Sequence, residues 1–171
     1  MNIFIYTLLM AYSGRYKPKH PKKYSGDPTN IFYRSMWERH CMVYFDTRND
    51  VLSWSSEEIQ IPYYYEGDKR YHRYFMDFKV TWMNKKTVLI EVKPFKETKP
   101  PKGDKRSKRY INEAYTYVKN QNKWEAAKEY AADRGWEFQI WTENELYRLG
   151  IMKKPFKKLK PLPKYSRKKN K

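Results

Sequence analysis

Apolar and polar residues alternate along residues 57–92, which is the pattern of strands that place one face against a core. The alternation predicts strands over residues 57–65, 71–83 and 87–92, separated by polar turns at 66–68 and 84–86. Residues 136–142 alternate in the same way and predict a last strand. The chain therefore supplies enough strands for a small sheet.

Two longer segments instead repeat their apolar residues at helical spacing. Residues 31–45 predict a helix, for which Asp27 or Asn30 is the expected N-terminal cap. Residues 110–134 predict a second helix and residues 143–149 a short third one. The order of helix, strands, helix and strand predicts an α/β fold, a small mixed sheet flanked by helices.

The two ends of the chain differ from its middle. Residues 11–29, rich in Lys, Pro, Tyr and Gly, predict an extended arm. Residues 151–171 form a Lys/Pro tail with too few apolar residues to fold alone. We therefore expect a basic N-terminal extension over 1–29, one folded domain over 30–150 and a basic tail over 151–171.

The first residues of the chain, 1–10, are apolar. They lack the basic segment and the cleavage site of a secretion signal, and they are far shorter than the roughly 20 residues of a membrane span. The sequence predicts a protein that is neither secreted nor bound to a membrane. Met1 and Met10 both remain open as the translation start.

Lysine and arginine dominate the charged residues, 37 against 19 acidic residues, for a formal net charge of +18. Residues 153–171 carry ten of the cations and no acid, which leaves 18 − 10 = +8 for the rest. Such a balance favours a polyanion as the partner, either nucleic acid or an anionic surface. The single Cys41 excludes an internal disulfide, and the three histidines (His20, His40, His72) lack the spacing of zinc ligands.

A candidate site arises where the second and third predicted strands pair. With a three-residue turn between them, Asp77 lies opposite Lys93. Lys79 then lies opposite Glu91. Asp77, Glu91 and Lys93 share one face in this register, and the apolar residues of both strands share the other. A two-residue turn would move Asp77 to the apolar face, which the hydrophobic pattern opposes.

The helix expected at residues 31–45 brings a third carboxylate. Glu38 lies on the same helical stripe as Met42 and Phe45, which are apolar. An unpaired carboxylate is costly on such a face, so Glu38 needs a cation or a hydrogen-bonding partner. A metal ion shared with the two strand carboxylates would supply one.

The three carboxylates and the lysine match the needs of phosphodiester hydrolysis. Carboxylate oxygens suit Mg²⁺, with Mn²⁺ as a substitute, and such an ion polarises the phosphate and activates water. A neighbouring lysine donates to the attacking water or to the developing charge. The pattern predicts a metal-dependent nuclease without a small-molecule cofactor. Its expected catalytic residues are Glu38, Asp77, Glu91 and Lys93, of which Glu38, Asp77 and Glu91 hold the metal.

These segments resemble a known family. Asp77 precedes Glu91-Val92-Lys93 by fourteen positions (91 − 77 = 14), which is similar to the PD-(D/E)xK nuclease superfamily. Met76 stands where the signature of that superfamily has proline. The amino-acid sequences of other segments are similar to those of the TnsA-like endonucleases and of the head-completion nucleases of large contractile-tailed phages. These segments are residues 33–39, 54–57, 61–63, 73–78, 89–94, 123–128 and 134–138.

The resemblance covers roughly residues 11–149 and implies a restriction-endonuclease-like core. It assigns metal binding to Asp77, Glu91 and Glu38, and assistance of the attacking water to Lys93. It implies double-stranded DNA as the substrate, with cleavage or trimming of packaged DNA before phage heads join tails. Portal or neck proteins of the phage would then be partners, and the virion or the host cytoplasm the location.

Residues 96–109 form a loop rich in Lys, Pro and Gly. We expect its cations to follow the phosphates of DNA, and a solvated loop is the alternative interpretation. The DNA-binding candidates are Lys96, Lys99, Lys102, Lys105, Arg106, Lys108 and Arg109.

Two other functions fit the charge. A non-catalytic structural or adaptor protein of a phage head and neck would bind DNA or the portal through basic arms. An RNA-binding protein of ribosomal type would use its aromatic residues, 18% of the chain, to stack bases, although aromatic residues more often build a core. The clustered acids count against RNA binding, because carboxylates repel phosphate unless a metal ion intervenes.

Overall fold

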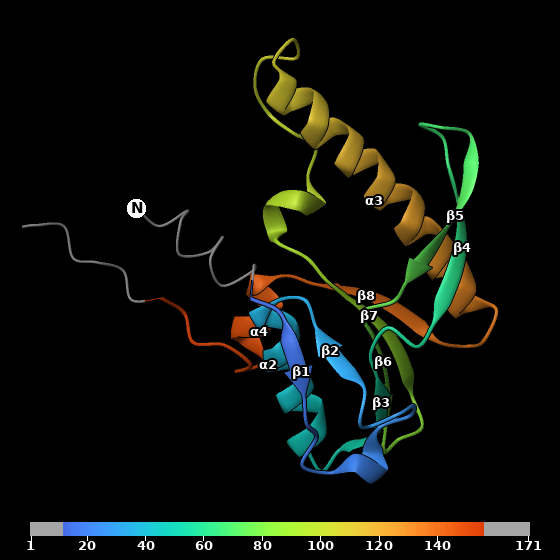
Figure 1. Cartoon of the computed structure of the whole chain (residues 1–171), viewed down its shortest axis with the longest axis vertical. Coiled ribbons are helices and arrows are strands. Elements are labelled where there is room, and N and C mark those ends of the chain that lie inside the picture. The colour runs from blue at the N-terminus through green and yellow to red at the C-terminus, as the bar shows by residue number, and fades with distance from the viewer. Residues whose placement is uncertain (1–11, 156–171) are drawn as a thin grey trace, which may run out of the picture.

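A four-stranded sheet forms the centre of the protein, as seen in a computed structural model that describes residues 12–155 (Figure 1). Its strands, in spatial order, are β3 (Val51–Ser55), β6 (Phe78–Trp82), β7 (Thr87–Val92) and β8 (Glu137–Trp141). β3 and β6 pair antiparallel, as do β6 and β7, whereas β8 runs parallel to β7. The predicted mixed sheet is therefore confirmed. Two 3-10 helices lie outside it, η1 (Pro21–Lys23) and η2 (Phe95–Thr98).

Helices α2 (Met36–Thr47) and α4 (Glu143–Arg148) cover one face of this sheet (Figure 1). Phe45 of α2 is fully buried there, and its ring contacts those of Trp54, Phe78 and Trp141. Burying a side chain of this size contributes about 1.5–3 kcal/mol. This aromatic core fixes α2, and with it the first turn of the helix, against the sheet.

The other face carries α3 (Lys108–Ala132) and a hairpin of β4 (Gln60–Tyr65) and β5 (Arg70–Phe75). Ile61 of β4, Leu89 of β7 and Ala127 of α3 belong to one buried cluster on this side. Alternate residues of β7 point to the first core instead, so all six residues of this strand are buried. β7 therefore joins the two cores.

The helix expected over residues 31–45 is wrong in its first part. β2 (Ile31–Tyr33) pairs antiparallel with β1 (Gly14–Tyr16), and α2 begins after it with Ser35 as the N-cap. A three-residue strand that buries its first and third residues looks, over so short a length, like the start of an apolar helical stripe. The pairing with β1 decides between the two, and β1 lies in a segment for which no strand was expected.

The extended arm expected over residues 11–29 is also wrong, because the segment packs on the domain from residue 12 onward. Tyr24 is buried in the core beneath α2. Asp46, near the end of α2, has no solvent exposure. It accepts hydrogen bonds from this segment at 2.6–3.0 Å, from the backbone nitrogens of Lys19 and His20 and from the hydroxyl of Tyr16. One buried acceptor thus orders a segment whose composition predicts an arm.

Residues 1–11 and 156–171 are not described, so the apolar start of the chain and most of the expected basic tail lie outside the described residues. Between these limits, no helix has both the length and the apolar character needed to cross a membrane.

The single strand expected over residues 71–83 is two strands in different sheets. β5 pairs with β4 and ends at Phe75, and β6 pairs with β3 and β7 and begins at Phe78. Met76 and Asp77 form the break between them. Each half finds a different partner, which the continuous alternation of the sequence does not reveal.

The register of β6 on β7 differs from the expected one by two residues. Lys79 pairs with Leu89 rather than with Glu91. The backbone nitrogen of Trp82 donates to the carbonyl of Lys86 at 2.9 Å, which closes a three-residue turn one position earlier than expected. Because side chains alternate with a period of two, this shift leaves the residues of β6 and β7 on their predicted faces. Tyr74 and Met76, which were expected on the apolar face with Phe78, instead belong to the buried cluster on the α3 side.

Candidate active site

Two of the predicted site residues lie at the carboxyl end of β7. Glu91 is 3% exposed, and its Oε2 accepts a hydrogen bond from the hydroxyl of Tyr74 at 2.6 Å. The Nζ of Lys93 lies 3.1 Å from the Oε1 of Glu91. The backbone nitrogen of Lys93 donates to the carbonyl of Trp141 at 3.0 Å, so β8 holds this end of β7 in place. Both oxygens of Glu91 therefore have a donor.

Asp77 lies at the break between β5 and β6. Its Oδ2 accepts a hydrogen bond from the backbone nitrogen of Val92 at 2.8 Å, which holds the side chain beside the end of β7. Asp77 keeps some solvent contact, yet burial raises the pKa of its carboxyl group well above the usual value. The negative charges of Glu91 and Glu38 raise this pKa further, and Lys93 lowers it. Asp77 therefore interacts with two other acidic groups and with one lysine.

Glu38 lies in the first turn of α2. Its Oε2 accepts from the backbone nitrogen of Arg34 at 2.7 Å and its Oε1 from the hydroxyl of Ser35 at 2.9 Å. Ser35 in turn accepts from the backbone nitrogen of Glu38 at 3.2 Å and so caps the first turn of the helix. Burial raises the pKa of Glu38. The hydrogen-bonding partner that the sequence required for Glu38 is therefore the start of its own helix.

The three carboxylates have the chemistry for a metal ion but are not arranged as a complete metal site. Within residues 12–155 there is no group of three or more His, Cys, Asp or Glu side chains arranged to hold a metal ion. The donor chemistry nevertheless suits a hard divalent cation, because Asp77, Glu91 and Glu38 all offer carboxylate oxygens. Burial is the main cause of the raised pKa values of Asp77 and Glu38, and neighbouring carboxylates raise both further. Metal binding by the three residues stays a prediction.

Lys123 is a candidate residue that the sequence reasoning missed. It lies on α3 with its Nζ 5.0 Å from the ring centroid of Tyr74. Burial lowers its pKa, the charge of Glu91 raises it, and the like charge of Lys93 lowers it. The signal was available in the sequence, because Lys123 stands four positions before Ala127 on the inward stripe of the helix. A lysine on an apolar stripe, like Glu38, needs a partner for its buried charge.

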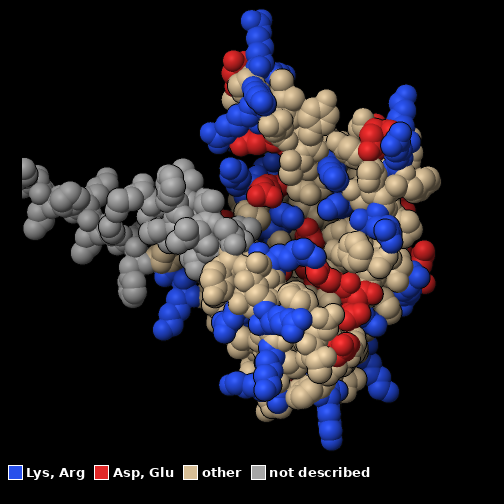
Figure 2. Space-filling model, in the orientation of Figure 1, with Lys and Arg blue, Asp and Glu red and all other residues tan. Residues whose placement is uncertain are grey.

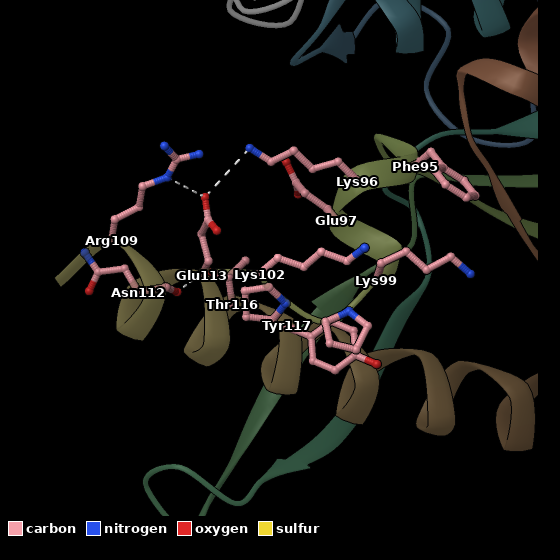
Figure 3. A pocket seen from close by; sticks show the side chains of 12 residues that line it. Phe95, Lys96, Glu97, Lys99, Lys102, Arg109, Asn112, Glu113, Thr116 and Tyr117 are labelled. Carbon is pink, nitrogen blue, oxygen red and sulfur yellow. Dashed lines mark hydrogen bonds and ion pairs between the residues drawn. The ribbon is translucent and has the colours of Figure 1, made fainter. Parts of the chain in front are cut away.

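The cations predicted to bind DNA divide into two groups. Lys96, Lys99, Lys102 and Arg109 line a cavity between η2, the loop that follows it, and α3 (Figure 3). The lining does not include the other three, which are Lys105, Arg106 and Lys108. Figure 2 shows acidic atoms gathered across the middle of one face of the molecule, with Lys and Arg side chains on all sides of them. This face is therefore basic around an acidic centre.

The mixed sheet therefore carries a glutamate and a lysine at the end of β7, with an aspartate beside them. Comparison with known proteins gives the class of this protein. Residues 48–143 match the family model described as "TnsA-like endonuclease N terminal". The chain therefore belongs to the TnsA-like endonuclease family.

A more specific relative is the "Head completion nuclease" of Enterobacteria phage T4. The two sequences are 41% identical over 147 residues, which cover 83% of this chain and 98% of that protein. The chain is a homologue of this head completion nuclease. No solved structure matches the chain.

Proposed function

We propose that this protein is a metal-dependent deoxyribonuclease with a restriction-endonuclease-like core. Its active site would consist of Glu38, Asp77, Glu91 and Lys93. The observation that carries the proposal is the contact of 3.1 Å between Lys93 and Glu91 at the end of β7, beside Asp77. Membership of an endonuclease family supports the phosphodiester bond as the bond that is cleaved.

Asp77 and Glu91 would hold Mg²⁺ or Mn²⁺, with Glu38 next to them. When bound, the ion supplies Lewis-acid activation of the phosphate and of the attacking water. The buried hydroxyl of Tyr74 orients Glu91 through its hydrogen bond. The backbone nitrogen of Val92 orients Asp77 in the same way.

Lys93 would act on the charge that develops during hydrolysis. Burial lowers the pKa of Lys93, but the charges of Glu91 and Asp77 outweigh this effect and raise it above the usual value. Lys93 is therefore cationic at neutral pH. A cation here donates a hydrogen bond to the attacking water or to a phosphate oxygen whose negative charge grows in the transition state.

The biological role that we propose is inferred from the similarity of this chain to the head completion nuclease. Homology with a head completion nuclease over most of both chains supports action on packaged double-stranded DNA during completion of a phage head. The enzyme would cleave or trim this DNA before heads join tails. Portal or neck proteins would be its partners, in the virion or in the host cytoplasm.

The proposal is tested by incubating the full chain with linear and circular double-stranded DNA in Mg²⁺, Mn²⁺ or chelator. Wild type is compared with Asp77→Asn, which removes the charge but keeps an oxygen for the hydrogen bond from Val92. Asp68→Asn is the matched control, because Asp68 is an exposed partner of His72 far along the hairpin.

We expect cutting in either metal by wild type and by Asp68→Asn, and none by Asp77→Asn or in chelator. Cutting in chelator would contradict the metal dependence. DNA binding without cutting in either metal would contradict catalysis and favour a structural DNA-binding protein. Cutting of the circular substrate would identify endonucleolytic action, and cutting of the linear substrate alone would identify action from ends.

A further inference from the structure

A cavity of about 620 Å³ lies close along the chain to the candidate active site, because its lining begins with Phe95. One wall is η2 with the loop that follows it, and the other is the first half of α3 (Figure 3). Phe95, at the start of η2, is two residues after Lys93, so the Cα atoms of these two residues are roughly 7 Å apart at most. The volume is in the usual range of small-molecule sites, about 300–1,000 Å³.

The walls of this cavity combine flat apolar surface with positive charge. Tyr117 lines the α3 side and Phe95 the η2 side, together with Pro100 and Pro101. Phe95 is 44% exposed, and the Nζ of Lys99 lies 5.2 Å from the centroid of its ring. Aromatic rings of this kind accept a stacked base, and an ammonium group beside them accepts a phosphate.

The charges at the opening connect the two walls. Glu113 of α3 forms ion pairs with Arg109 of the same helix at 3.1 Å and with Lys96 of η2 at 3.8 Å (Figure 3). The lining as a whole has four cations, which are Lys96, Lys99, Lys102 and Arg109, against two acids, Glu97 and Glu113. Glu113 therefore links the two walls, and the lining keeps a net positive charge that favours an anionic occupant.

We infer that this cavity binds an unpaired nucleotide of the DNA substrate, an inference that rests on the proposed nuclease function. Bases inside a duplex are stacked on each other and offer no free face to Tyr117 or Phe95. A nucleotide of a single-stranded tail offers both a base to stack and a phosphate for the lysines. The preferred substrate is then DNA with a single-stranded tail or flap, cut close to the nucleotide held in the cavity.

The test compares a blunt DNA hairpin with the same hairpin bearing a short single-stranded tail. Binding to the full-length protein is measured by fluorescence anisotropy in chelator, where no cutting is needed. The variants are Tyr117→Ala, which removes the ring, and Tyr117→Phe, which keeps it. Tyr115→Ala is the matched control, because Tyr115 is on the same helix, is 60% exposed and is not part of the lining.

We expect wild type, Tyr115→Ala and Tyr117→Phe to bind the tailed hairpin more tightly than the blunt one. Tyr117→Ala should lose at least about fivefold of this preference, the effect of losing one stacked base. Equal affinity of wild type for the two hairpins would overturn the inference. So would a preference that Tyr117→Ala keeps in full.

Cutting of both hairpins in Mg²⁺ is measured in parallel and separates this inference from the proposed function. A tail preference in binding without any cutting contradicts the nuclease but not the cavity. Cutting of both hairpins with equal affinity contradicts the cavity but not the nuclease.

Discussion

Replacing Asp77 by asparagine is expected to abolish cleavage and also to make the metal-free protein more stable. In the metal-free protein the charge of Asp77 is poorly hydrated and faces the like charges of Glu91 and Glu38. Asparagine removes this charge and keeps an oxygen for the 2.8 Å hydrogen bond from the backbone nitrogen of Val92. The variant therefore loses the repulsion by Glu91 and Glu38 together with the smaller attraction by Lys93.

The size of the effect follows from the surroundings of Asp77. Burying a polar group without full compensation costs about 1–3 kcal/mol in mutational data. Lys93 neutralises part of the charge and Asp77 keeps some solvent contact, so we expect the lower part of this range, about 1–2 kcal/mol. In a chain of this size, 1 kcal/mol changes Tm by about 2–4 °C. Asp77→Asn should therefore raise Tm by about 2–8 °C.

The stabilisation depends on pH in a definite direction. The pKa of Asp77 in the folded protein is raised above its ordinary value of 3.8, so the fold prefers the protonated form. Wild type has its full stability below the pKa of the unfolded chain and loses part of it as pH rises through the pKa of the folded state. The Tm difference should be near zero in acid, at about pH 3–4, and grow as pH increases.

Differential scanning fluorimetry in chelator over a pH series measures this difference, with Asp68→Asn as the control for an exposed carboxylate. Addition of Mg²⁺ should reverse the order at neutral pH. A ligand at a hundredfold excess over its Kd stabilises the protein that binds it by about 2.7 kcal/mol, and only wild type should bind. A Tm for Asp77→Asn below that of wild type in chelator at every pH would refute the reasoning, even if cleavage were lost.

Three further predictions concern other residues. Lys93→Met should slow single-turnover cleavage about 10²–10³-fold, while Mg²⁺ still raises Tm, because the lysine acts on developing charge; loss of the Mg²⁺ effect would argue for a role in metal binding instead. Lys123→Met should slow cleavage about tenfold without lowering stability in urea denaturation, because burial disfavours its charge; a clear loss of stability would contradict this. Asp46→Ala should cost about 1.5–3 kcal/mol and expose the chain near Lys19 and His20 to limited proteolysis, because their backbone nitrogens lose a charged acceptor; an unchanged digestion pattern would count against this anchor.

The central strand and its chemistry could be predicted from the sequence because they depend on local alternation. The expected strand over residues 87–92 has the bounds of β7, and the faces of Leu89 and Glu91 are as predicted. The expected register of β7 with β6 was wrong by two residues, but a shift of two residues leaves each side chain of these strands on the same face. The predicted grouping of Glu91 with Lys93 was therefore correct although the predicted strand register was wrong.

Features that depend on the choice of partner were not predictable. The alternation of residues 71–83 runs unbroken through Met76 and Asp77, although the chain changes sheets there. β2 was hidden for the same reason, since its partner β1 lies in a segment of arm-like composition. The predicted carboxylate of Glu38 was found near Asp77, but the cap that it forms with Ser35 requires knowing where α2 begins.

The burial of β7 in both cores has a consequence for how the protein denatures. A strand shared by two hydrophobic clusters cannot leave one without disturbing the other, so the α2 side and the α3 side should melt as one cooperative unit. Glu91 and Lys93 are carried by this shared strand. No partly folded form should then retain the site, and heat inactivation should coincide with the global unfolding transition.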